Sequence, residues 1–318
     1  PMCYHCASFG QRPDQPAAMS AYNIETRHYH PRFWPVWLLL GLGWSVAQLP
    51  FRLQLALGRG LGRLVKVISA ERRHVTRRNL EVCFPNLSQA EQKQLFHDAF
   101  DELGIGFIEI GLAYWGKPAR VDPLCHLSGM EHIEKARADG KGVMLIAAHM
   151  TSLELCLRMF SERQPTAAMY KPAHNDLFEQ YSALKRSRYT IPVPNRSIRP
   201  FLSHMRKGGV AFYLPDQHYG FRFSVFAPFF GVQTATIAKT PEFINITGAA
   251  VIPVLFGRRD DGYHIEVQPA LDYPTGDAVM DATLLNQCIE NNIRRYPAQY
   301  LWQHRRFKSR PQGEPSIY

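Results

Sequence analysis

His149 and Glu154 are the residues of this sequence whose types and spacing are best suited to chemistry. They end the segment Gly-Val-Met-Leu-Ile-Ala-Ala-His-Met-Thr-Ser-Leu-Glu, residues 142–154, in which an apolar run gives way to polar residues. Such a run predicts a buried strand that ends at a loop, where open α/β sheets place their chemistry. A carboxylate on the next turn can hold the imidazole in one tautomer, as a general base acting on a hydroxyl requires.

The spacing of this pair is weak evidence by itself, because the chain has 13 histidines and 27 acidic residues among 318. Roughly one histidine with an acid five positions later is expected by chance. The sequence contains four such pairs: His97/Glu102, His126/Glu131, His149/Glu154 and His174/Glu179. Only His149 leaves a strand-like run and enters a helix-like one, so we single it out.

A structural interpretation of the same residues stands beside the catalytic one. Thr151 to Glu154 fits a capping box, in which Glu154 would cap a helix. His149 would then be a hydrogen-bonded histidine at the edge of the core. The two roles of Glu154 are compatible, since a cap would also fix the carboxylate near the strand end.

The composition indicates a globular protein with an anionic partner. A chain of 318 residues can bury a full core, as one large domain or two small ones. The net charge of +10 favours anionic lipid, a membrane surface, an acidic protein or nucleic acid as the partner, with a solvated basic surface as the alternative. One Cys-x-x-Cys at positions 3–6 has no second pair, so the cysteines favour a reduced, cytosolic setting over a zinc site.

Phe33 to Phe51 is a second strong pattern, with 19 uncharged residues rich in leucine and tryptophan. A helical span needs about 20 such residues, and tryptophan is typical of the membrane interface. Cations interleaved with leucines follow, which predicts an amphipathic stretch on anionic lipid with its C-terminal side in the cytoplasm. We expect membrane association, with a transmembrane helix favoured over a helix lying flat. A buried helix with a basic edge is the alternative.

Alternating strand and helix patterns predict one α/β domain, a mixed central sheet flanked by helices. Ser88 to Glu91 is a capping box that should open a helix to about Tyr114. Strands are predicted at 166–171, 209–215, 249–257 and 263–269, and helices near 174–186, 197–207, 234–247 and 281–296. The expected parts are a disordered or non-native tail at 1–28, a membrane anchor and amphipathic helix at 29–70, and a catalytic domain at 71–318.

A carboxylate also stands at a second strand end, where Leu-Pro-Asp places Asp216 after the strand at 209–215. We expect His149 and Asp216 at one edge of the sheet, with several cations within reach. A metal-dependent hydrolase using these two residues and His218 is a weaker alternative, because no third histidine has a fixed helical spacing. A non-catalytic anchored scaffold would leave the strand-end base and carboxylate unexplained.

Five blocks of this sequence, in order, resemble the late acyltransferases of lipid A biosynthesis, in particular their lauroyl-type branch. The resemblance runs from about Tyr29 to Tyr318. The blocks are His149–Glu154, Tyr170–Asn175, Pro215–Gly220, Phe226–Phe230 and Gln299–Lys308. The resemblance implies a bacterial inner-membrane enzyme with its catalytic domain on the cytoplasmic face. It would move an acyl chain, laurate or similar, from acyl carrier protein to a 3-hydroxyacyl hydroxyl of a Kdo-bearing lipid A precursor. No metal, organic cofactor or nucleic acid is implied.

Four site residues follow from this resemblance. The catalytic pair of the family falls on His149 and Glu154, its essential arginine on Arg186 and its essential aspartate on Asp216. His149 would take the proton of the acceptor hydroxyl as it attacks the thioester, while Glu154 holds the ring. Arg186 would donate to the oxyanion or bind a lipid phosphate, and Asp216 would hold Arg186 or the acceptor.

Two positions depart from the pattern of the family. The usual Tyr-Arg-Pro contains Lys171, which loses any bidentate contact made there, and the usual acid after Asp-Gln is His218. Both changes would affect how the acceptor fits, and Lys171 remains a candidate for substrate binding. The runner-up function is acylation of a glycerophospholipid, which the same superfamily performs.

Overall fold

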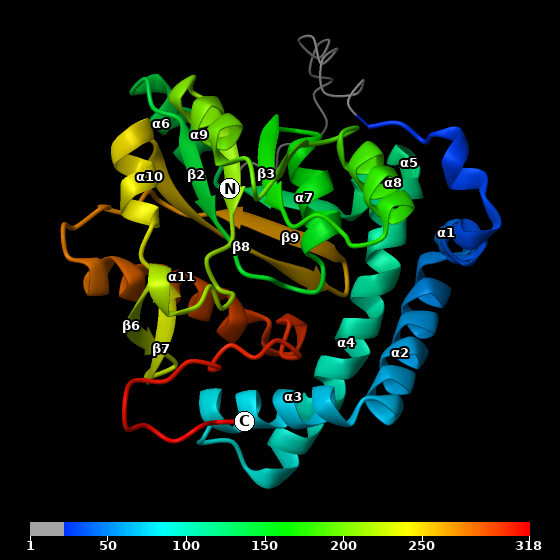
Figure 1. Ribbon diagram of the computed structural model, residues 1–318, viewed down its shortest axis with the longest axis horizontal. Coiled ribbons are helices and arrows are strands. Elements are labelled where there is room, and N and C mark those ends of the chain that lie inside the picture. Colours follow the sequence, from blue (N-terminus) through cyan, green and yellow to red (C-terminus); the bar gives the residue numbers. More distant parts are fainter. Residues whose placement is uncertain (1–21) are drawn as a thin grey trace.

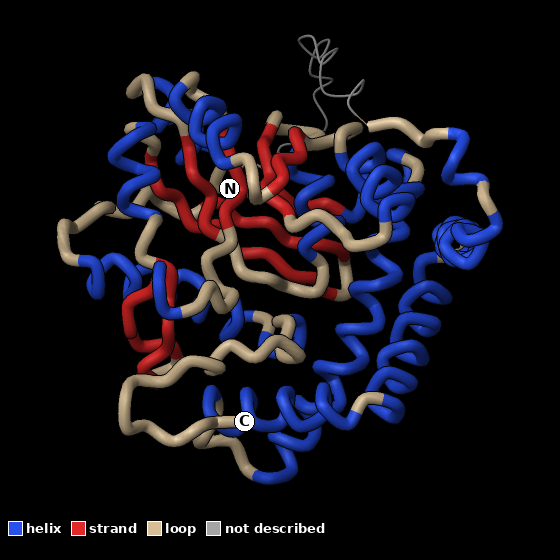
Figure 2. The backbone as a smooth tube through the Cα atoms, viewed as in Figure 1, coloured by secondary structure: helices blue, strands red, loops and turns tan. Residues whose placement is uncertain are grey.

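The computed structural model describes residues 22–318, and its centre is a seven-stranded sheet in the order β1-β9-β8-β2-β5-β3-β4 (Figure 1). Its strands are β1 (Cys125–Ser128), β2 (Val143–Ile146), β3 (Thr166–Tyr170), β4 (Ile191–Pro194), β5 (Val210–Tyr213), β8 (Ala250–Arg259) and β9 (Gly262–Val267). All neighbours are parallel except β8 and β9, and β6 (Ser224–Phe229) and β7 (Val232–Ile237) form a separate antiparallel pair. Helices surround the strands (Figure 2), so the predicted mixed sheet flanked by helices is confirmed.

The helices precede, connect and cover these strands. They are α1 (Trp34–Gln48), α2 (Phe51–Ile68), α3 (Ala70–Cys83), α4 (Gln89–Trp115), α5 (Pro118–Val121), α6 (Glu131–Ala138), α7 (Leu153–Ser161), α8 (Asp176–Arg186), α9 (Ile198–Arg206), α10 (Thr240–Thr247) and α11 (Ala278–Arg295). The prediction from the capping box is confirmed, since the Ser88 side chain accepts the Glu91 N–H and the Glu91 side chain accepts the Ser88 N–H at the start of α4.

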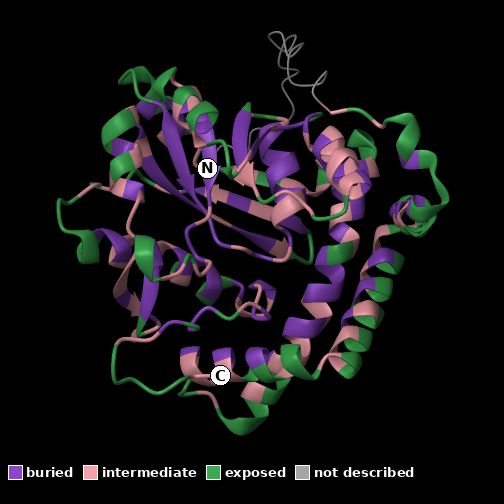
Figure 3. Ribbon diagram, in the orientation of Figure 1, coloured by how far each residue is buried: buried purple, intermediate pink, exposed green. Residues whose placement is uncertain are grey.

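The hydrophobic core lies on both faces of the sheet, and β2 shows how its residues divide. Val143 and Leu145 belong to one buried cluster with side chains of α4 and α7. Met144 and Ile146 belong to a second cluster with side chains of α9 and α10. Because both faces are covered, β2 is a continuous apolar run, as is typical of buried parallel strands. Figure 3 shows the buried sheet and the exposed outer sides of the helices around it.

The apolar segment Phe33 to Phe51, predicted as a transmembrane span, is divided between two helices. Leu49 is extended and ends α1, since a residue before proline is disfavoured in the helical conformation, and α2 begins after Pro50. The 15 residues of α1 rise about 22 Å, against about 30 Å of bilayer hydrocarbon. Within residues 22–318 no helix combines the length and apolar content needed to cross a membrane. The expected transmembrane helix is therefore not confirmed.

α2 packs along α4 with the two backbones in direct contact through glycines. A Cβ added to Gly62 would lie 1.9 Å from the Phe100 carbonyl oxygen. One added to Gly104 would lie 2.0 Å from the Gly58 carbonyl oxygen. Both distances are far below van der Waals contact, so any side chain at these positions would force the helices apart.

α4 is tied in turn to the sheet by a buried ion-pair cluster. Arg258 of β8 contacts Glu102 at 2.5 Å and Glu109 at 3.1 Å, both on α4. The Tyr263 hydroxyl of β9 donates to Glu109 at 2.6 Å. Burial raises the pKa of Glu109 to about 7, although Arg258 and Tyr263 oppose that shift. A charged cluster in the interior thus fixes α4 against the strands.

Two predictions need comment: the helix expected at 234–247, and the tail expected at 1–28, which extends into the described residues. The first part of the predicted helix at 234–247 is strand β7, because Thr234, Thr236 and Ile237 are β-branched and favour a strand; α10 begins only at Thr240. Part of the predicted tail, residues 1–21, lies outside the described residues. Of the remainder, His28 is buried and contacts Asp176 of α8 at 2.9 Å.

Candidate active site

The His149 ring is held by Asp216. Nδ1 of His149 lies 2.5 Å from one carboxylate oxygen of Asp216, and the His149 backbone N–H donates to the other oxygen at 2.8 Å. The Asp216 side chain is fully buried, whereas the His149 side chain is 25% exposed. The pair therefore has a buried carboxylate behind a ring that reaches the surface.

Strand adjacency brings these two residues together. β2 and β5 are parallel neighbours, with Ile146 paired to Tyr213 at their carboxyl ends. His149 lies three residues after the first strand and Asp216 three residues after the second. The predicted meeting of His149 and Asp216 at one edge of the sheet is confirmed.

The segment after α11 closes over the loop that carries His149. The Leu301 N–H donates to the His149 carbonyl at 3.0 Å, and the Thr151 N–H donates to the Gln299 carbonyl at 2.7 Å. Met150 and Tyr300 form an isolated antiparallel bridge between these bonds. Residues 299–301 thus hold the loop as a short added strand would.

The electrostatics of Asp216 favour one protonation state of the pair. Burial alone would raise the pKa of Asp216, but the charge and hydrogen bonds of His149 outweigh it and lower that pKa. An ionised Asp216 accepts a hydrogen bond from the Nδ1–H of His149, so in the neutral ring Nε2 is the unprotonated nitrogen. Such a ring can take a proton from a hydroxyl presented to Nε2.

Glu154 does not hold the His149 ring, and this expectation is corrected by its contacts. Its two carboxylate oxygens accept from Nε of Arg186 at 2.8 Å and from Nη2 at 2.7 Å. The Tyr189 hydroxyl donates to the same carboxylate at 2.6 Å. The expectation that Asp216 holds Arg186 is also wrong, because the Asp216 carboxylate contacts His149 instead. The two predicted acids have exchanged the partners assigned to them.

The bidentate pair of Glu154 and Arg186 is largely enclosed, with side-chain exposures of 13% and 23%. Burial lowers the pKa of Arg186, but the Glu154 charge and hydrogen bonds outweigh it and raise that pKa, so the guanidinium stays charged. Its carbon also lies 5.4 Å from the centre of the Tyr170 ring. Among residues 22–318 Nη1 of Arg186 donates no hydrogen bond, so it can donate to a ligand.

The structural interpretation of Glu154 is also corrected. The residue before α7 is Ser152, and neither its side chain nor a capping box caps that helix. Glu154 instead lies in the first turn of α7 and turns toward the end of α8. Lys171, the other predicted binding residue, follows β3 and is exposed. No described hydrogen bond or ion pair joins Lys171 to His149, Asp216, Glu154 or Arg186.

Two residues behind Asp216 were not predicted to belong to the site. Arg306 is 1% exposed, and its guanidinium donates to the Ala235 carbonyl at 2.7 Å. Burial lowers the pKa of Arg306, and the charges of Tyr300 and Asp216 partly offset that effect. Burial likewise lowers the pKa of His304 to about 4, so this ring is neutral. The feature of the sequence that could have indicated them is the alternation of aromatic and basic residues at 300–308.

The weaker metal-site alternative used His149, Asp216 and His218. His218 lies 2.5 Å from the Ser309 hydroxyl through Nε2, so the three residues do not converge on one point. In the described chain, the group of three whose ligand atoms approach one another is His126, Asp261 and His264, on the edge strand β1, on its neighbour β9 and in the turn before β9.

The sequence matches a known family over nearly its whole length. The profile of the family described as "Bacterial lipid A biosynthesis acyltransferase" covers residues 22–309. A lipid A biosynthesis lauroyltransferase of Escherichia coli (strain K12) is 36% identical over 300 residues, which are 93% of this chain and 98% of that protein. A lipid A biosynthesis palmitoleoyltransferase of the same organism is 36% identical over 91% of this chain and 96% of its own length. A myristoyltransferase of that pathway, also from E. coli, is 30% identical over 91% of each chain.

Proposed function

This chain belongs to the bacterial lipid A biosynthesis acyltransferase family, and we propose that it transfers a fatty acyl chain from acyl carrier protein to a hydroxyl group of the lipid A precursor. The proposed acceptor group is the 3-hydroxyl of an acyl chain already on a Kdo-bearing precursor. The observation that carries the proposal is the His149–Asp216 pair, whose partly exposed ring and buried carboxylate can serve as a general base at a strand end.

In the proposed reaction, the acceptor hydroxyl lies at Nε2 of His149. The ring takes the hydroxyl proton while the oxygen attacks the thioester carbonyl, and Asp216 stabilises the imidazolium that forms. Collapse of the intermediate breaks the carbon–sulfur bond, and the imidazolium returns the proton to the leaving thiolate of the carrier. The products are an ester and the free thiol, so the base is regenerated in each cycle.

Arg186 is the proposed donor to the oxyanion. The carboxylate of Glu154 occupies its Nε and Nη2, which fixes the plane of the guanidinium and directs Nη1 away from Glu154. A preorganised cation in a partly enclosed site stabilises developing negative charge more than a mobile one does. Glu154 therefore acts in this proposal as a positioning residue for Arg186.

The proposed location is the cytoplasmic face of the inner membrane, with α1 and α2 lying on the bilayer. Large apolar side chains on these helices are exposed: Trp34, Leu38, Leu39, Leu42, Trp44, Leu53, Leu57, Leu64, Val67 and Ile68. Arg52, Arg59 and Arg63 are interspersed among them, which suits an anionic lipid surface. Flotation of the protein with anionic vesicles tests this part, and failure to float would contradict it.

The proposed acyl group is laurate, with palmitoleate and myristate as the alternatives that the names of the relatives suggest. The identity to the lauroyl and palmitoleoyl enzymes is the same, 36%, so the assay must compare the acyl chains directly. Parallel reactions with each acyl carrier protein thioester, analysed by mass spectrometry of the lipid, identify the preferred chain.

Substitution of His149 tests the proposed base. We expect His149→Ala to lower the rate of acyl transfer by about 100- to 10,000-fold, the usual contribution of general-base catalysis. His174→Ala is the matched control, because His174 is also followed by an acid five residues later but is exposed on a loop. Wild-type turnover by His149→Ala, or preference of the wild type for lysophosphatidic acid as acceptor, would overturn the proposal.

A further inference from the structure

Three side chains with metal-ligating atoms meet at the edge of the sheet, outside the His149 site. His126 lies on the edge strand β1, His264 on its neighbour β9, and Asp261 in the turn between β8 and β9. Nε2 of His264 lies 2.8 Å from one carboxylate oxygen of Asp261, and Nε2 of His126 lies 3.8 Å from the other. Both rings therefore direct the same nitrogen toward one carboxylate.

Strand pairing and a tight turn bring these side chains together. His126 and His264 are partners in the parallel pairing of β1 with β9. Their rings stack, with centres 4.6 Å apart and planes inclined at 22°. Asp261 is the second of the two turn residues between the paired residues Arg259 and Gly262. A turn this short places its carboxylate beside both rings.

The backbone that carries Asp261 and His126 is closely packed. Gly262, which follows Asp261, has a φ of +140°, and a Cβ there would lie 2.3 Å from the Leu124 carbonyl oxygen. Leu124 is the residue before β1. The turn and the start of β1 are thus in direct backbone contact, which fixes the origins of the two side chains relative to each other.

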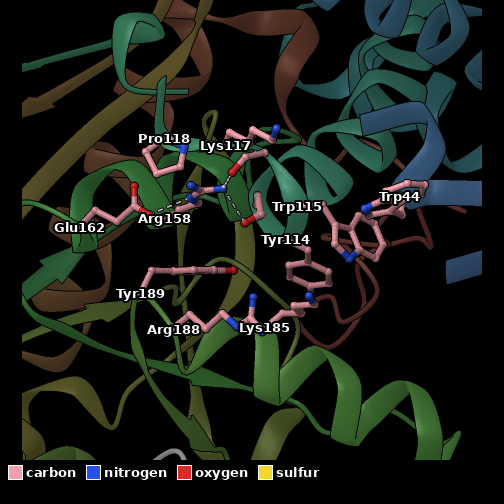
Figure 4. A pocket seen from close by; sticks show the side chains of 12 residues that line it. Trp44, Tyr114, Trp115, Lys117, Pro118, Arg158, Glu162, Lys185, Arg188 and Tyr189 are labelled. Carbon is pink, nitrogen blue, oxygen red and sulfur yellow. Dashed lines mark hydrogen bonds and ion pairs between the residues drawn. The ribbon is translucent and has the colours of Figure 1, made fainter. Parts of the chain in front are cut away.

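The chain that leads into β1 is anchored as well. Arg158 donates to three backbone carbonyls at the end of α4, where Lys117 and Pro118 begin the way to β1 (Figure 4). Arg120 of α5 donates to the Gln48 carbonyl at 3.0 Å. The ligand atoms therefore lie on a preorganised scaffold, which lowers the entropic cost of binding an ion.

The donor set suits Zn²⁺ and similar transition metals. Imidazole is a good ligand for these ions, whereas Mg²⁺ and Ca²⁺ prefer oxygen ligands alone. Zinc bonds of about 2.0–2.2 Å place the ligand atoms of a tetrahedral site about 3.4 Å apart. The three ligand atoms here all lie within 4.8 Å of one another, so small side-chain rotations bring them to that spacing. The exposed side chains of His126 and Asp261 leave a fourth position for water.

Hydrogen bonding is the alternative use of the same atoms. Nε2 of His264 would donate to the Asp261 carboxylate at 2.8 Å, and Nε2 of His126 to the Asp261 carbonyl at 3.1 Å. Both contacts are exposed to solvent, so they contribute little to stability. An ion needs the same Nε2 atoms unprotonated, with the proton of each neutral ring on Nδ1. The two uses therefore exclude each other, and an experiment can separate them.

We propose that His126, Asp261 and His264 bind one Zn²⁺ ion or a similar divalent transition metal, which links β1 to the β8–β9 turn. β1 has four residues and pairs with β9 on one side only. The bound ion gives this short edge strand a second attachment to the sheet. The inference concerns a site apart from acyl transfer and does not depend on the proposed function.

Zinc titration of the full chain without an affinity tag tests the proposal. Cys3 and Cys6, outside the described residues, can also ligate Zn²⁺, so every protein in the series carries Cys3→Ser and Cys6→Ser. We expect calorimetry to show a Zn²⁺ site that Mg²⁺ does not compete for. His126→Ala and His264→Ala should each weaken binding about 100-fold or more, since even the loss of an outer partner of a ligand weakens binding by about 10- to 100-fold.

His74→Ala is the matched control for the loss of one histidine, because His74 is exposed on α3 and belongs to no such group in the described chain. It should bind Zn²⁺ as the reference protein does. Absence of Zn²⁺ binding by the reference protein, or equal binding by His126→Ala and His264→Ala, would overturn the proposal.

Asp261→Asn separates ion binding from hydrogen bonding. Asparagine keeps an acceptor oxygen and suits the same turn, but it has no charge to offer the ion. At a Zn²⁺ concentration about 100 times the Kd, the folded-to-unfolded ratio of the reference protein should rise about 100-fold. The measurement is a rise in melting temperature that EDTA reverses. Asp261→Asn should match the reference protein in EDTA and gain much less from Zn²⁺; equal gains, or no gain in either, would contradict the proposal.

Discussion

The two acidic residues of the site, Asp216 and Glu154, differ in what they hold and in how the fold brings them there. Asp216 is fully buried at a strand end and contacts the His149 ring. Glu154 is on a helix, close to His149 in sequence, and contacts Arg186 and Tyr189. Proximity in sequence therefore did not decide which acid serves the base. The adjacency of two parallel strands decided it.

This division gives each carboxylate one electrostatic task. In the proposed reaction, Asp216 fixes the tautomer of a ring that gains and loses a proton in every cycle. Glu154 fixes the direction of a cation that keeps its charge throughout. Because the tasks differ, the substitutions that remove them should differ in size and in kind.

The largest difference is expected between Asp216→Asn and Glu154→Gln. Asp216→Asn removes the carboxylate that keeps the proton on Nδ1, so kcat should fall on the order of 1,000-fold or more. Glu154→Gln leaves the base intact, and its kcat should fall less. Single-turnover rates at saturating acceptor measure both. A larger loss in Glu154→Gln than in Asp216→Asn would reverse the roles assigned here.

A smaller effect is expected from Arg186→Lys, which tests geometry against charge. Lysine keeps the positive charge but cannot donate to both Glu154 oxygens and still present a third nitrogen in the same plane. We expect kcat to fall about tenfold to a hundredfold, the range for a lost oxyanion donor partly replaced by charge. Activity equal to that of the wild type would exclude the proposed role of Nη1, and normal binding of the acceptor is the control for folding.

The smallest effect is expected from Tyr189→Phe. The substitution removes one hydrogen bond to Glu154 but keeps the bidentate contact with Arg186. Loss of one such bond corresponds to about threefold in rate. A fall as large as that of Arg186→Lys would show that Tyr189, rather than Arg186, sets the position of the Glu154 carboxylate.

The sequence was sufficient to predict five of the seven strands of the sheet, the strand end at His149 and the place of Asp216 beside it, but not the short strands β1 and β4. It did not determine which acid contacts the ring, because helical spacing and strand adjacency each place a carboxylate within reach of an imidazole. The division of the apolar segment at Pro50 has a different cause. Hydropathy over Phe33 to Phe51 favoured one long helix, whereas the restriction that proline imposes on Leu49 is local and ends α1.

Strand β7 was missed for a related reason. The β-branched residues at 234–237 adjoin an apolar pattern of helical period, so the sequence predicted one helix over both segments. Pairing with β6 decides the outcome, and that partner is visible only once the two strands are placed together. The cluster behind Asp216 is likewise formed by the C-terminal segment folding back, a long-range contact that local patterns do not contain.

The glycine-lined contact between α2 and α4 has a mechanical consequence for an enzyme that works on a lipid. Gly62 and Gly104 let the two helices approach until their backbones are in contact, which leaves no room for a side chain between them. Arg258 links α4 in turn to the sheet. If α1 and α2 rest on the bilayer as proposed, the contact between α2 and α4 sets the height of the His149 ring above the lipid headgroups. Replacing either glycine would change how far the acceptor must rise from the membrane to react.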